Sequence, residues 1–256
     1  MNDHLLLNKT IVITGGTKGV GRELVLGLAK KGANIVFCGL DEKAGQKILD
    51  ESIRQKLNVK FVVMDLSDVN NIKKLFDIAE KEYSKVDGFV SYAGITPFGS
   101  LIDCTEESFD KVFDINFKAT FFGCKYAIQS MKKSGGGSIV ITGSPHAWGG
   151  ANDRAAYSCS KGALLTLMKH IAHNYASEMI RCNYLTLGWT ATESEIALRK
   201  KAGLDYDEFL KYAIPLIPMK HMGEPTDYTE AYSFLLSDDS KYTTGSVLQM
   251  TAGLFI

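Results

Sequence analysis

The sequence predicts an α/β protein with a single doubly wound, seven-stranded parallel sheet and helices on both of its faces. Three observations predict this fold class. Short β-branched or aromatic runs alternate with longer stretches of helical period, no repeat or linker interrupts the 256 residues, and 45% of them are hydrophobic, which suffices for one large core. We therefore expect one domain over residues 1–256.

Strands and helices are expected in regular alternation along the chain. Seven runs have the composition of buried strands: Thr10–Thr14, Asn34–Cys38, Val59–Val63, Asp87–Ser91, Ser138–Thr142, Ile180–Leu185 and Ser246–Met250. The segments of helical period are Val20–Lys31, Asp41–Lys56, Asn70–Ser84, Glu106–Lys133, Ala156–Glu178 and Thr226–Ser237. A helix between successive strands is typical of parallel pairing.

The stretch after the sixth predicted strand breaks this alternation. Residues 189–223 are long for a connection and contain Pro215 and Pro218. An insertion at this point lies at the carboxyl edge of the sheet, where doubly wound sheets bind ligands. We therefore expect residues 189–223 to form a lid over a substrate.

Composition excludes several classes of function. Lys and Arg number 29, as do Asp and Glu, so the net charge is zero and neither nucleic acid nor an anionic membrane is an expected partner. The chain has neither a signal-peptide core nor a spanning apolar run, which favours a cytoplasmic location. Its five scattered cysteines are expected to be reduced and mostly buried, with no metal site.

A glycine-rich stretch, "TGGTKGVG", directly follows the first predicted strand. Gly15, Gly19 and Gly21 form the pattern G-x-x-x-G-x-G before an amphipathic helix. Such a loop allows a tight turn, a close approach of backbone to a pyrophosphate, and a helix N-terminus that faces the phosphates. A glycine-rich turn that binds nothing is the alternative, and the pattern of a nucleotide-hydrolysing phosphate loop is missing.

Tyr157 and Lys161 lie four residues apart at the start of a helical run, on one face of that helix. A phenol with a pKa of about 10 is a poor base at neutral pH. An ammonium about 4 Å away would stabilise the phenolate by about 4 kcal/mol, or about three pKa units, before its own desolvation is subtracted. The pair therefore predicts a proton-transfer device with a tyrosine pKa near 7, although taken alone it is equally compatible with an exposed helix pair.

Other constellations support different chemistry poorly. Ser144 and His146 are close in sequence but lack the G-x-S-x-G pattern and an acidic partner, so a serine hydrolase is disfavoured. His170 and His173 have no local third ligand, and a partly exposed helix face is the better interpretation.

The glycine loop together with Tyr157-x-x-x-Lys161 resembles the short-chain dehydrogenase/reductase family, whose domain is of the Rossmann type. The resemblance runs from about residue 8 to the C-terminus. It includes "MDLSD", "AG", "INF" and "SIVITGS", which hold Asp65, Ala93–Gly94, Asn116 and Ser144. It implies hydride transfer between a nicotinamide cofactor and a small carbonyl or alcohol substrate.

The resemblance also implies the site residues. The catalytic ones would be Asn116, Ser144, Tyr157 and Lys161, with Ser144 rather than Thr142 at the matching serine position. Asn116 would help carry a proton relay through water to Lys161, which would also bind the nicotinamide ribose. The cofactor would contact Gly15, Thr17, Lys18, Gly19, Val20, Gly21, Asp65, Ala93, Gly94, Tyr157, Lys161, Gly188 and Thr192. A homotetramer or homodimer through the helices around 106–133 and 156–178 is implied as well.

Two short stretches depart from the family pattern. "SYAG" at residues 91–94 stands where Asn-Asn-Ala-Gly is usual, and "LG" at residues 187–188 stands for Pro-Gly. The first departure threatens sheet hydrogen bonds more than chemistry, and the second affects the shape of a loop. They leave open a non-catalytic dinucleotide-binding scaffold or sensor, and a lyase or dehalogenase on the same fold. The complete set of Ser144, Tyr157 and Lys161 favours the oxidoreductase.

Cofactor choice depends on the end of the second predicted strand, where an acidic side chain would bind a ribose 2′-hydroxyl and repel a 2′-phosphate. The acidic position of NAD-using relatives is Gly39 here, and the arginine of many NADP-using relatives is Leu40. Lys18 matches a residue that binds the 2′-phosphate, whereas Asp41 argues for NAD(H). We expect NADP(H) to be favoured over NAD(H).

Residues near the predicted lid bear on the substrate. Trp148, Trp189, Glu193 and Glu195 would give a pocket of indole faces and carboxylates, which suits a polyol or a sugar, although exposed lid residues are an equal alternative. Four further aromatic residues are interpreted as packing more than recognition: Phe98, Tyr206, Phe209 and Tyr212.

Overall fold

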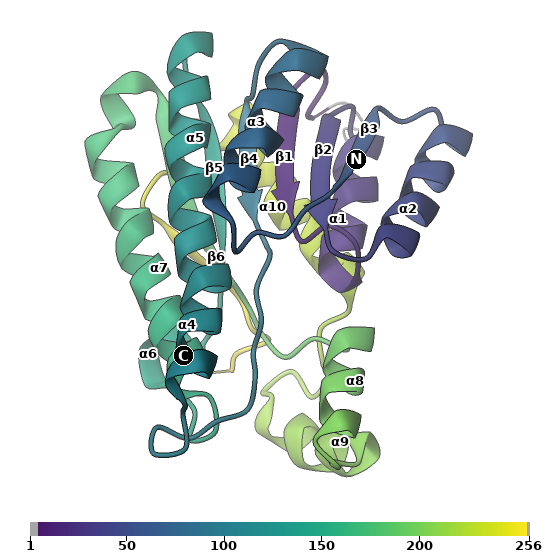
Figure 1. Ribbon diagram of the computed structural model, residues 1–256, viewed down its shortest axis with the longest axis vertical. Coiled ribbons are helices and arrows are strands. Elements are labelled where there is room, and N and C mark those ends of the chain that lie inside the picture. Colours follow the sequence, from purple (N-terminus) through teal and green to yellow (C-terminus); the bar gives the residue numbers. More distant parts are fainter. Residues whose placement is uncertain (1–4, 255–256) are drawn as a thin grey trace.

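Seven parallel strands form the centre of the computed structural model, which describes residues 5–254. Their spatial order is β3-β2-β1-β4-β5-β6-β7. The strands are β1 (Thr10–Thr14), β2 (Asn34–Gly39), β3 (Val59–Val63), β4 (Gly88–Ser91), β5 (Gly137–Gly143), β6 (Ile180–Leu187) and β7 (Val247–Met250). All seven predicted strands are therefore present, and the predicted fold class is confirmed (Figure 1).

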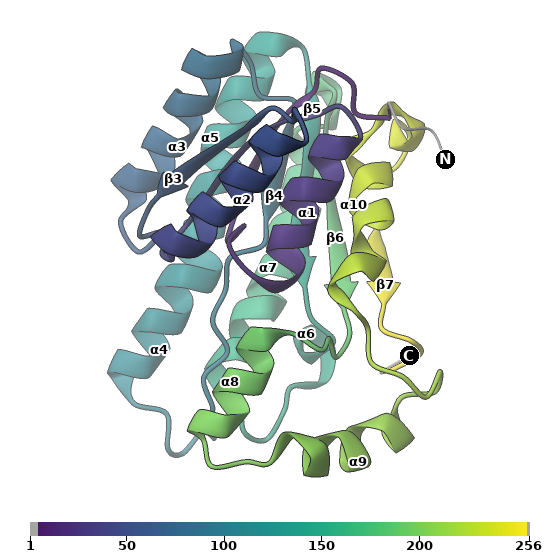
Figure 2. The same cartoon turned by 90° about the vertical axis from the view of Figure 1, so that its right-hand side faces the viewer.

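Helices cover both faces of the sheet (Figures 1 and 2). Their bounds are α1 (Gly19–Lys30), α2 (Glu42–Arg54), α3 (Val69–Tyr83), α4 (Glu106–Val112), α5 (Ala119–Ser134), α6 (His146–Gly149), α7 (Ala155–Asn174), α8 (Glu193–Lys201), α9 (Tyr206–Leu216) and α10 (Thr229–Leu236). One core lies beneath α3, α5 and α7, and a second lies beneath α1, α2 and α10. The strands between them are buried on both faces, which explains their nearly continuous apolar character.

The helix predicted over 106–133 is wrong as one continuous element. A π-helical segment, η1 (Phe113–Lys118), separates α4 from α5. The Thr120 hydroxyl, in the first turn of α5, donates to the carbonyl oxygen of Asn116 in η1 at 2.8 Å, and the Asn116 side chain bonds to the backbone of Ile95. These tertiary contacts stabilise one wider turn, which a count of apolar positions does not reveal.

The helix predicted over 156–178 also ends early. The α7 helix stops at Asn174 and a 3-10 turn, η2 (Ala176–Glu178), follows it before Met179 adopts a left-handed conformation. The helix predicted over 226–237 begins as a second 3-10 turn, η3 (Pro225–Tyr228), before α10. A third 3-10 turn, η4 (Asp238–Ser240), precedes β7.

The topology positions a ligand site at one edge of the sheet. The chain crosses to opposite sides after β1 and after β4, two strands that are neighbours in the sheet. A crevice forms outside the carboxyl ends of strands at such a switch point. Helices α8 and α9 stand beyond this same edge, apart from the layers that cover the sheet (Figures 1 and 2).

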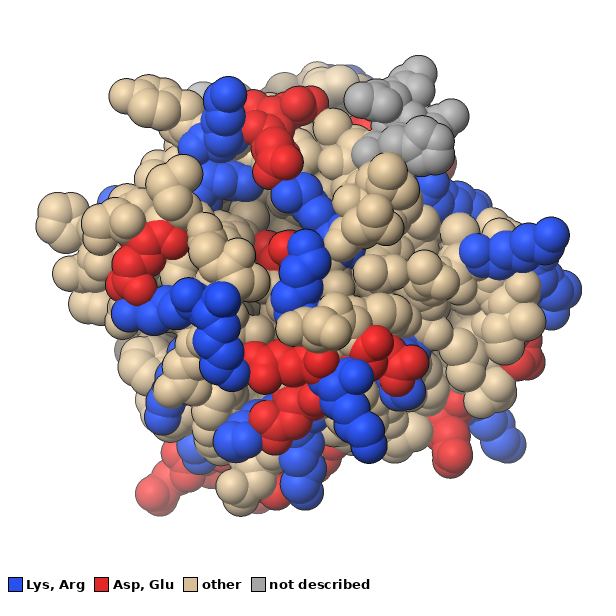
Figure 3. All heavy atoms as spheres, turned by 90° about the horizontal axis from the view of Figure 1, so that it is seen from above, with Lys and Arg blue, Asp and Glu red and all other residues tan. Residues whose placement is uncertain are grey.

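The opposite end of the molecule carries mixed charge. Acidic and basic side chains alternate over it, as Figure 3 shows from above. Among residues 5–254, no helix is long and apolar enough to cross a bilayer, and no cluster of three or more potential metal-binding side chains occurs. The five cysteines are free, and Cys38, Cys124 and Cys182 are buried as expected. The predicted domain 1–256 includes six terminal residues that lie outside the described ones.

Candidate active site

The glycine loop lies between β1 and α1 and packs against the loop that follows β4. Gly15 has a φ of +75°, and a Cβ there would lie 2.8 Å from the Cα of Ala93. A Cβ on Gly21 would collide with the carbonyl oxygen of Gly15. Only glycine meets both requirements, because L residues with a side chain rarely adopt this φ and no space remains for a Cβ. Backbone is therefore held close to the N-terminus of α1, as the motif predicts.

Tyr92 is a residue of this loop region to which the sequence assigned no role. Its side chain lines the cleft, and the backbone N–H groups of Val20 and Gly21, at the N-terminus of α1, bond to its hydroxyl. Burial raises the pKa of Tyr92 to about 12, and these two N–H groups act in the opposite direction. The only sequence signal was the departure from the usual asparagine at this position.

The expected loss of sheet hydrogen bonds at "SYAG" does not occur. The backbone N–H groups of Tyr92 and Ala93 both donate to the Thr14 hydroxyl, at 3.2 and 3.3 Å. The Ser91 hydroxyl is 2.6 Å from the Thr120 hydroxyl. Side chains of neighbouring elements therefore satisfy the polar groups of this segment, which removes the main structural objection raised by the departure.

A cleft of about 830 Å³ opens at the carboxyl edge of the sheet. The predicted site residues that line it are Val20, Gly94, Ser144, Tyr157, Lys161, Gly188 and Thr192. A second hollow of about 890 Å³ lies on the other side of Thr192 and is lined by Thr17, Lys18 and Gly19.

Five other predicted site residues line neither hollow. Gly15, Gly21 and Ala93 form the glycine-loop packing described above. Asn116 lies behind the cleft wall. Asp65 is exposed, and its carboxylate accepts hydrogen bonds from the Ser67 backbone and hydroxyl at 2.9 and 2.8 Å.

Tyr157 and Lys161 both lie on α7 and face the cleft, but the expected pKa of the tyrosine is wrong. The Lys161 Nζ lies 5.7 Å from the centroid of the Tyr157 ring. Burial raises the pKa of Tyr157 above its usual value, and a hydrogen bond with Ser144 only partly offsets this. Burial also lowers the pKa of Lys161 to about 8. Desolvation, and not mutual attraction, is the largest influence on the pKa of each group, so the expected value near 7 is not reached.

The backbone around β5 positions both partners of Tyr157. Lys161 donates from Nζ to the carbonyl oxygen of Thr142 at 2.9 Å. The Thr142 hydroxyl is occupied by the Tyr232 hydroxyl at 2.7 Å. Ser144, at the end of β5, therefore supplies the hydroxyl that bonds with Tyr157.

Asn116 is fully buried in η1 and is held by three hydrogen bonds. Its Nδ2 donates to the carbonyl oxygen of Ile95 at 2.9 Å and to the Ser160 hydroxyl at 3.2 Å, and its Oδ1 accepts from the Ile95 N–H at 2.8 Å. A Cβ on Gly94 would lie 3.3 Å from Asn116 Oδ1 and 3.9 Å from Lys161 Nζ. Asn116 and Lys161 thus approach the same glycine from two elements.

Two arginines of the cleft were missed by the sequence analysis. Arg154 begins the turn into α7 three residues before Tyr157, and Arg199 follows Glu195 by one turn of α8. Their side chains are 9% and 11% exposed. The spacing of Arg199 from Glu195 is that of a helical ion pair, but only the tertiary structure brings Arg154 to the same carboxylate.

The aromatic and acidic substrate candidates divide into three groups: those that line the cleft, one that lines the second hollow, and those that line neither. Trp189, Glu195, Phe209 and Tyr212 line the cleft. Trp148 is half-exposed and packs edge-on to Tyr184. Glu193 lines the second hollow, whereas Phe98 and Tyr206 line neither space.

The two residues expected to decide cofactor choice contact each other. Lys18 Nζ lies 2.7 Å from Asp41 Oδ2, at the rim of the second hollow. The hydrogen bond from Lys18 and the N–H of Ala44 hold the pKa of the Asp41 carboxyl below its usual value. A Cβ on Gly39 would lie 2.6 Å from the Thr17 side chain, so an acidic residue at position 39 would require the glycine loop to shift.

A glycine loop at a switch point of a doubly wound sheet, next to a buried serine, a buried lysine and a partly buried tyrosine, defines the class of nicotinamide-dependent oxidoreductases. The family model described as enoyl-(acyl carrier protein) reductase matches residues 15–254. An uncharacterised oxidoreductase of Thermotoga maritima is 31% identical over 96% of both chains. L-rhamnose 1-dehydrogenase (NAD(P)(+)) of Azotobacter vinelandii is 33% identical over 98% of both.

Further comparisons agree. Dehydrogenase/reductase SDR family member 4 of Mus musculus is 33% identical, over 97% of this chain and 88% of its own. A putative gluconate dehydrogenase from Agrobacterium tumefaciens has a TM-score of 0.92 at 25% identity, over 100% of this chain and 99% of its own. An actinorhodin polyketide ketoreductase mutant, solved with NADPH, shares the fold with a TM-score of 0.91 at 23% identity, over 96% and 97%.

The chain belongs to the short-chain dehydrogenase/reductase family. It is an NAD(P)-dependent enzyme that acts on CH–OH donors.

Proposed function

We propose that the enzyme interconverts a carbonyl and a secondary alcohol by hydride transfer, with Tyr157 as the general acid and base. The observation that carries this proposal is the hydrogen bond between Ser144 and Tyr157 in a cleft that Lys161 also lines. In reduction, the carbonyl carbon gains a hydride and the oxygen gains the phenol proton of Tyr157. The raised pKa of Tyr157 keeps this proton on the phenol at neutral pH, as a general acid requires.

Ser144 and Lys161 have separate tasks in this mechanism. The Ser144 hydroxyl holds the substrate oxygen next to Tyr157 and stabilises the charge that develops on it. Lys161, with a pKa of about 8, is positively charged at neutral pH and stabilises the phenolate that Tyr157 becomes after giving up its proton. Asn116 supports the Lys161 side of the cleft through its contacts near Gly94.

The described residues fit a nicotinamide dinucleotide, which supplies or accepts the hydride when it is bound. The glycine loop is a cradle that a Cβ would fill, and Thr192 lies on the wall of both hollows, so one extended ligand can contact the two. The residues that would hold it are Gly15, Thr17, Lys18, Gly19, Val20, Gly21, Asp65, Ala93, Gly94, Tyr157, Lys161, Gly188 and Thr192. The Tyr92 hydroxyl, at the N-terminus of α1, is an additional contact that we propose.

The proposed mechanism predicts that Tyr157→Phe abolishes turnover and leaves cofactor binding nearly unchanged. The substitution removes the proton that the reaction needs, whereas the aromatic ring keeps its packing. We would follow NADPH oxidation with a panel of ketones and sugars, and cofactor binding by nicotinamide fluorescence. Turnover by Tyr157→Phe at the wild-type rate would contradict the role of the phenol.

We propose that NADP(H) is preferred over NAD(H). Gly39 places no carboxylate at the end of β2, and Lys18 can leave Asp41 to bind a 2′-phosphate. We expect Lys18→Ala to weaken NADPH binding about tenfold and to leave NADH binding within about twofold, since the pair is exposed and a charged hydrogen bond of this kind contributes about 1.5 kcal/mol. Fluorescence titration of the wild type and the variant with both cofactors measures this. A preference for NADH in the wild type would transfer the role to Asp41, and no micromolar binding of either cofactor would favour the scaffold or dehalogenase alternatives.

The segment 189–223 is proposed as the substrate lid of a single domain that spans residues 1–256. Helices α8 and α9 contribute Glu195, Arg199, Phe209 and Tyr212 to the cleft wall. This mixture of aromatic and polar side chains favours a substrate with several hydroxyl groups, of the polyol, sugar or sugar-acid class, and the rhamnose dehydrogenase and the putative gluconate dehydrogenase among the compared proteins agree with such a substrate.

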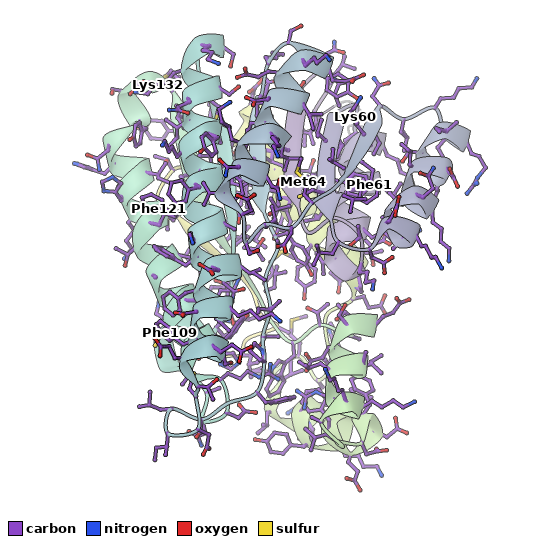
Figure 4. All side chains as sticks on the ribbon, viewed as in Figure 1. Lys60, Phe61, Met64, Phe109, Phe121 and Lys132 are labelled. Carbon is purple, nitrogen blue, oxygen red and sulfur yellow. The ribbon has the colours of Figure 1, made fainter. Side chains whose placement is uncertain are left out.

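A homodimer or homotetramer is proposed through the outer faces of α4, α5 and α7. Figure 4 shows Phe109 and Phe121 along the column that α4 and α5 form, and each is 44% exposed. Five phenylalanine rings follow one another there: Phe109, Phe113, Phe117, Phe121 and Phe122. Exposed apolar stripes of this kind mark protein interfaces. A cytoplasmic location remains a prediction from the sequence.

A further inference from the structure

Two guanidinium groups are enclosed at the substrate end of the cleft. The side chains of Arg154 and Arg199 are 9% and 11% exposed, and both line the cleft that holds Tyr157. One comes from the start of α7 and the other from the proposed lid. An enclosed cation is costly unless an anionic group compensates it, so the partners of these two residues indicate what the cleft is built to bind.

Arg154 is fixed in place by its own side of the cleft. Its Nη1 donates to the carbonyl oxygen and the hydroxyl of Thr96, at 2.9 and 2.5 Å, and its guanidinium lies 4.4 Å above the Phe98 ring. The nearest carboxylate oxygens, of Asp153 and Glu195, are each 3.9 Å away, which is too long for a hydrogen bond. The other two guanidinium nitrogens, Nε and Nη2, are thus held in a fixed orientation but make no direct hydrogen bond to a carboxylate.

Arg199 is fixed from the lid side. Its Nε lies 2.7 Å from Oε1 of Glu195, and its guanidinium lies 3.3 Å above the Phe209 ring. This hydrogen bond uses Nε of Arg199. Neither terminal nitrogen of its guanidinium donates a hydrogen bond to another of residues 5–254, so both can bind a further acceptor. Glu195 is therefore the single enclosed carboxylate, at 20% exposure, between two enclosed guanidinium groups.

Among the cleft residues that are shielded from water, positive charges outnumber negative ones. Arg154, Arg199 and Lys161 are cationic and largely shielded from water, whereas Asp153, the second acidic residue, is 58% exposed. One further anion would compensate the excess. A guanidinium presents two parallel donors that match the two oxygens of a carboxylate, which makes a carboxylate the preferred group.

Building on the proposed function, we propose that the substrate is a hydroxy acid or keto acid whose carboxylate is bound by Arg154 and Arg199. Its reacting carbon then lies at Ser144 and Tyr157, on the same side of the cleft as Arg154. The positive charge of Arg154 already reaches this position, because it lowers the pKa of Tyr157 against the dominant effect of burial. The opposing interpretation is that Arg154, Glu195 and Arg199 only connect the lid to α7.

Matched pairs of acid and polyol separate these two interpretations. We would titrate the enzyme, saturated with its cofactor, with glycerate, xylonate and gluconate and with glycerol, xylitol and glucitol, and measure affinity by calorimetry at low salt. Each acid differs from its polyol by a carboxylate in place of a hydroxymethyl group. We expect at least one acid to bind ten times more tightly than its polyol. Equal or weaker binding of all three acids would overturn the proposal.

Variants identify the residues that recognise the carboxylate. Arg199→Gln and Arg154→Gln should weaken acid binding at least tenfold and leave polyol binding within about twofold, and Arg199→Lys should restore part of it. Lys200→Gln removes a neighbouring exposed charge of α8 and should change neither. An equal loss for acid and polyol would assign the arginines to lid closure and overturn the proposal.

Turnover is measured separately from binding. Oxidation of the acid that binds most tightly tests the proposed function, whereas affinity tests the substrate class. An acid that binds through the arginines but is never oxidised would support the inference and contradict the proposed hydride transfer.

Discussion

Among single residues, Lys161 shows that the site lowers the free energy of unfolding of the protein. It is 5% exposed, and its Nζ donates to a backbone carbonyl oxygen, while the ion pairs of residues 5–254 do not include it. Desolvation therefore lowers its pKa to about 8 from an ordinary value near 10.5. Below pH 8 both the folded and the unfolded chain hold the proton, and the folded state carries a penalty of about 3 kcal/mol. Between pH 8 and 10.5 the unfolded chain binds more protons, so this penalty disappears as the pH rises.

We predict that Lys161→Met removes this pH dependence. The free energy of unfolding of the variant, minus that of the wild type, should decrease by about 3 kcal/mol between pH 8 and 10.5. The lost hydrogen bond to Thr142 shifts the difference equally at every pH and does not change this slope. Urea unfolding at several pH values measures it, with Lys169→Met, an exposed lysine of the same helix, as the control. A difference that is constant with pH would show that Lys161 is not desolvated in the folded state.

Single residues also differ in how far the sequence predicts their place in the site. Tyr157 and Lys161 could be proposed from their local spacing along one helix, and Ser144 from the resemblance to the family, and the structure places all three at one cleft. Arg154 and Arg199 could not, because only the folding of α8 across the cleft brings both to Glu195. The expected pKa of Tyr157 was wrong because burial, which is the largest influence on the pKa of both groups, is a property of the whole site.

At the scale of elements, the lid helix α8 depends on its ends more than on a core. None of its nine residues is buried, and the Thr192 hydroxyl accepts a hydrogen bond from the N–H of Glu195 at 3.1 Å as its N-cap. An element without apolar burial opens locally at low free energy. The same residue lies on the wall of both hollows, so the order of α8 and the shape of the proposed cofactor site are connected.

We predict that Thr192→Val loosens α8 without lowering the melting temperature of the protein. Loss of the N-cap costs about 1 kcal/mol, which corresponds to about fivefold faster amide hydrogen exchange across residues 193–201. Hydrogen exchange with mass spectrometry measures this, and Thr192→Ser, which keeps the hydroxyl, should exchange at the wild-type rate. Unchanged exchange in the valine variant would mean that contacts across the cleft, and not the cap, hold the helix.

Strands and helices could be predicted where their apolar residues recur with a regular period. The seven strands and the main helices follow from apolar runs and turn residues. The π-helical turn at Asn116 was not predictable, because one extra residue per turn preserves an apolar face while tertiary bonds to Ile95 and Thr120 stabilise it. Helices α8 and α9 were expected only as a lid, because α8 has no buried face to give it a period.

At the scale of the whole molecule, the position of the site follows from topology. The strand order places β1 and β4 side by side, and their carboxyl ends bring the glycine loop within contact distance of Ala93. Doubly wound order is the general expectation for such alternation, so the location of the cleft could be predicted. The net charge of the cleft could not be predicted. Acidic and basic residues are equal in number along the chain, and only the tertiary structure shows which of them are enclosed in the cleft.

The exposed phenylalanines of α4 and α5 predict an interface between copies of the chain. A ring that is 44% exposed is unfavourable in water, and a row of them is expected to be covered by a second copy of the chain in the proposed homodimer or homotetramer. Phe121→Glu would place a charge in that interface, where an unpaired charge is costly, and should yield monomers in sedimentation velocity at micromolar concentration. Phe234→Glu on α10, at 41% exposure on the other face of the sheet, is the matched control and should keep the wild-type mass. A wild-type monomer, or a Phe121→Glu variant of unchanged mass, would show that this surface is not the interface.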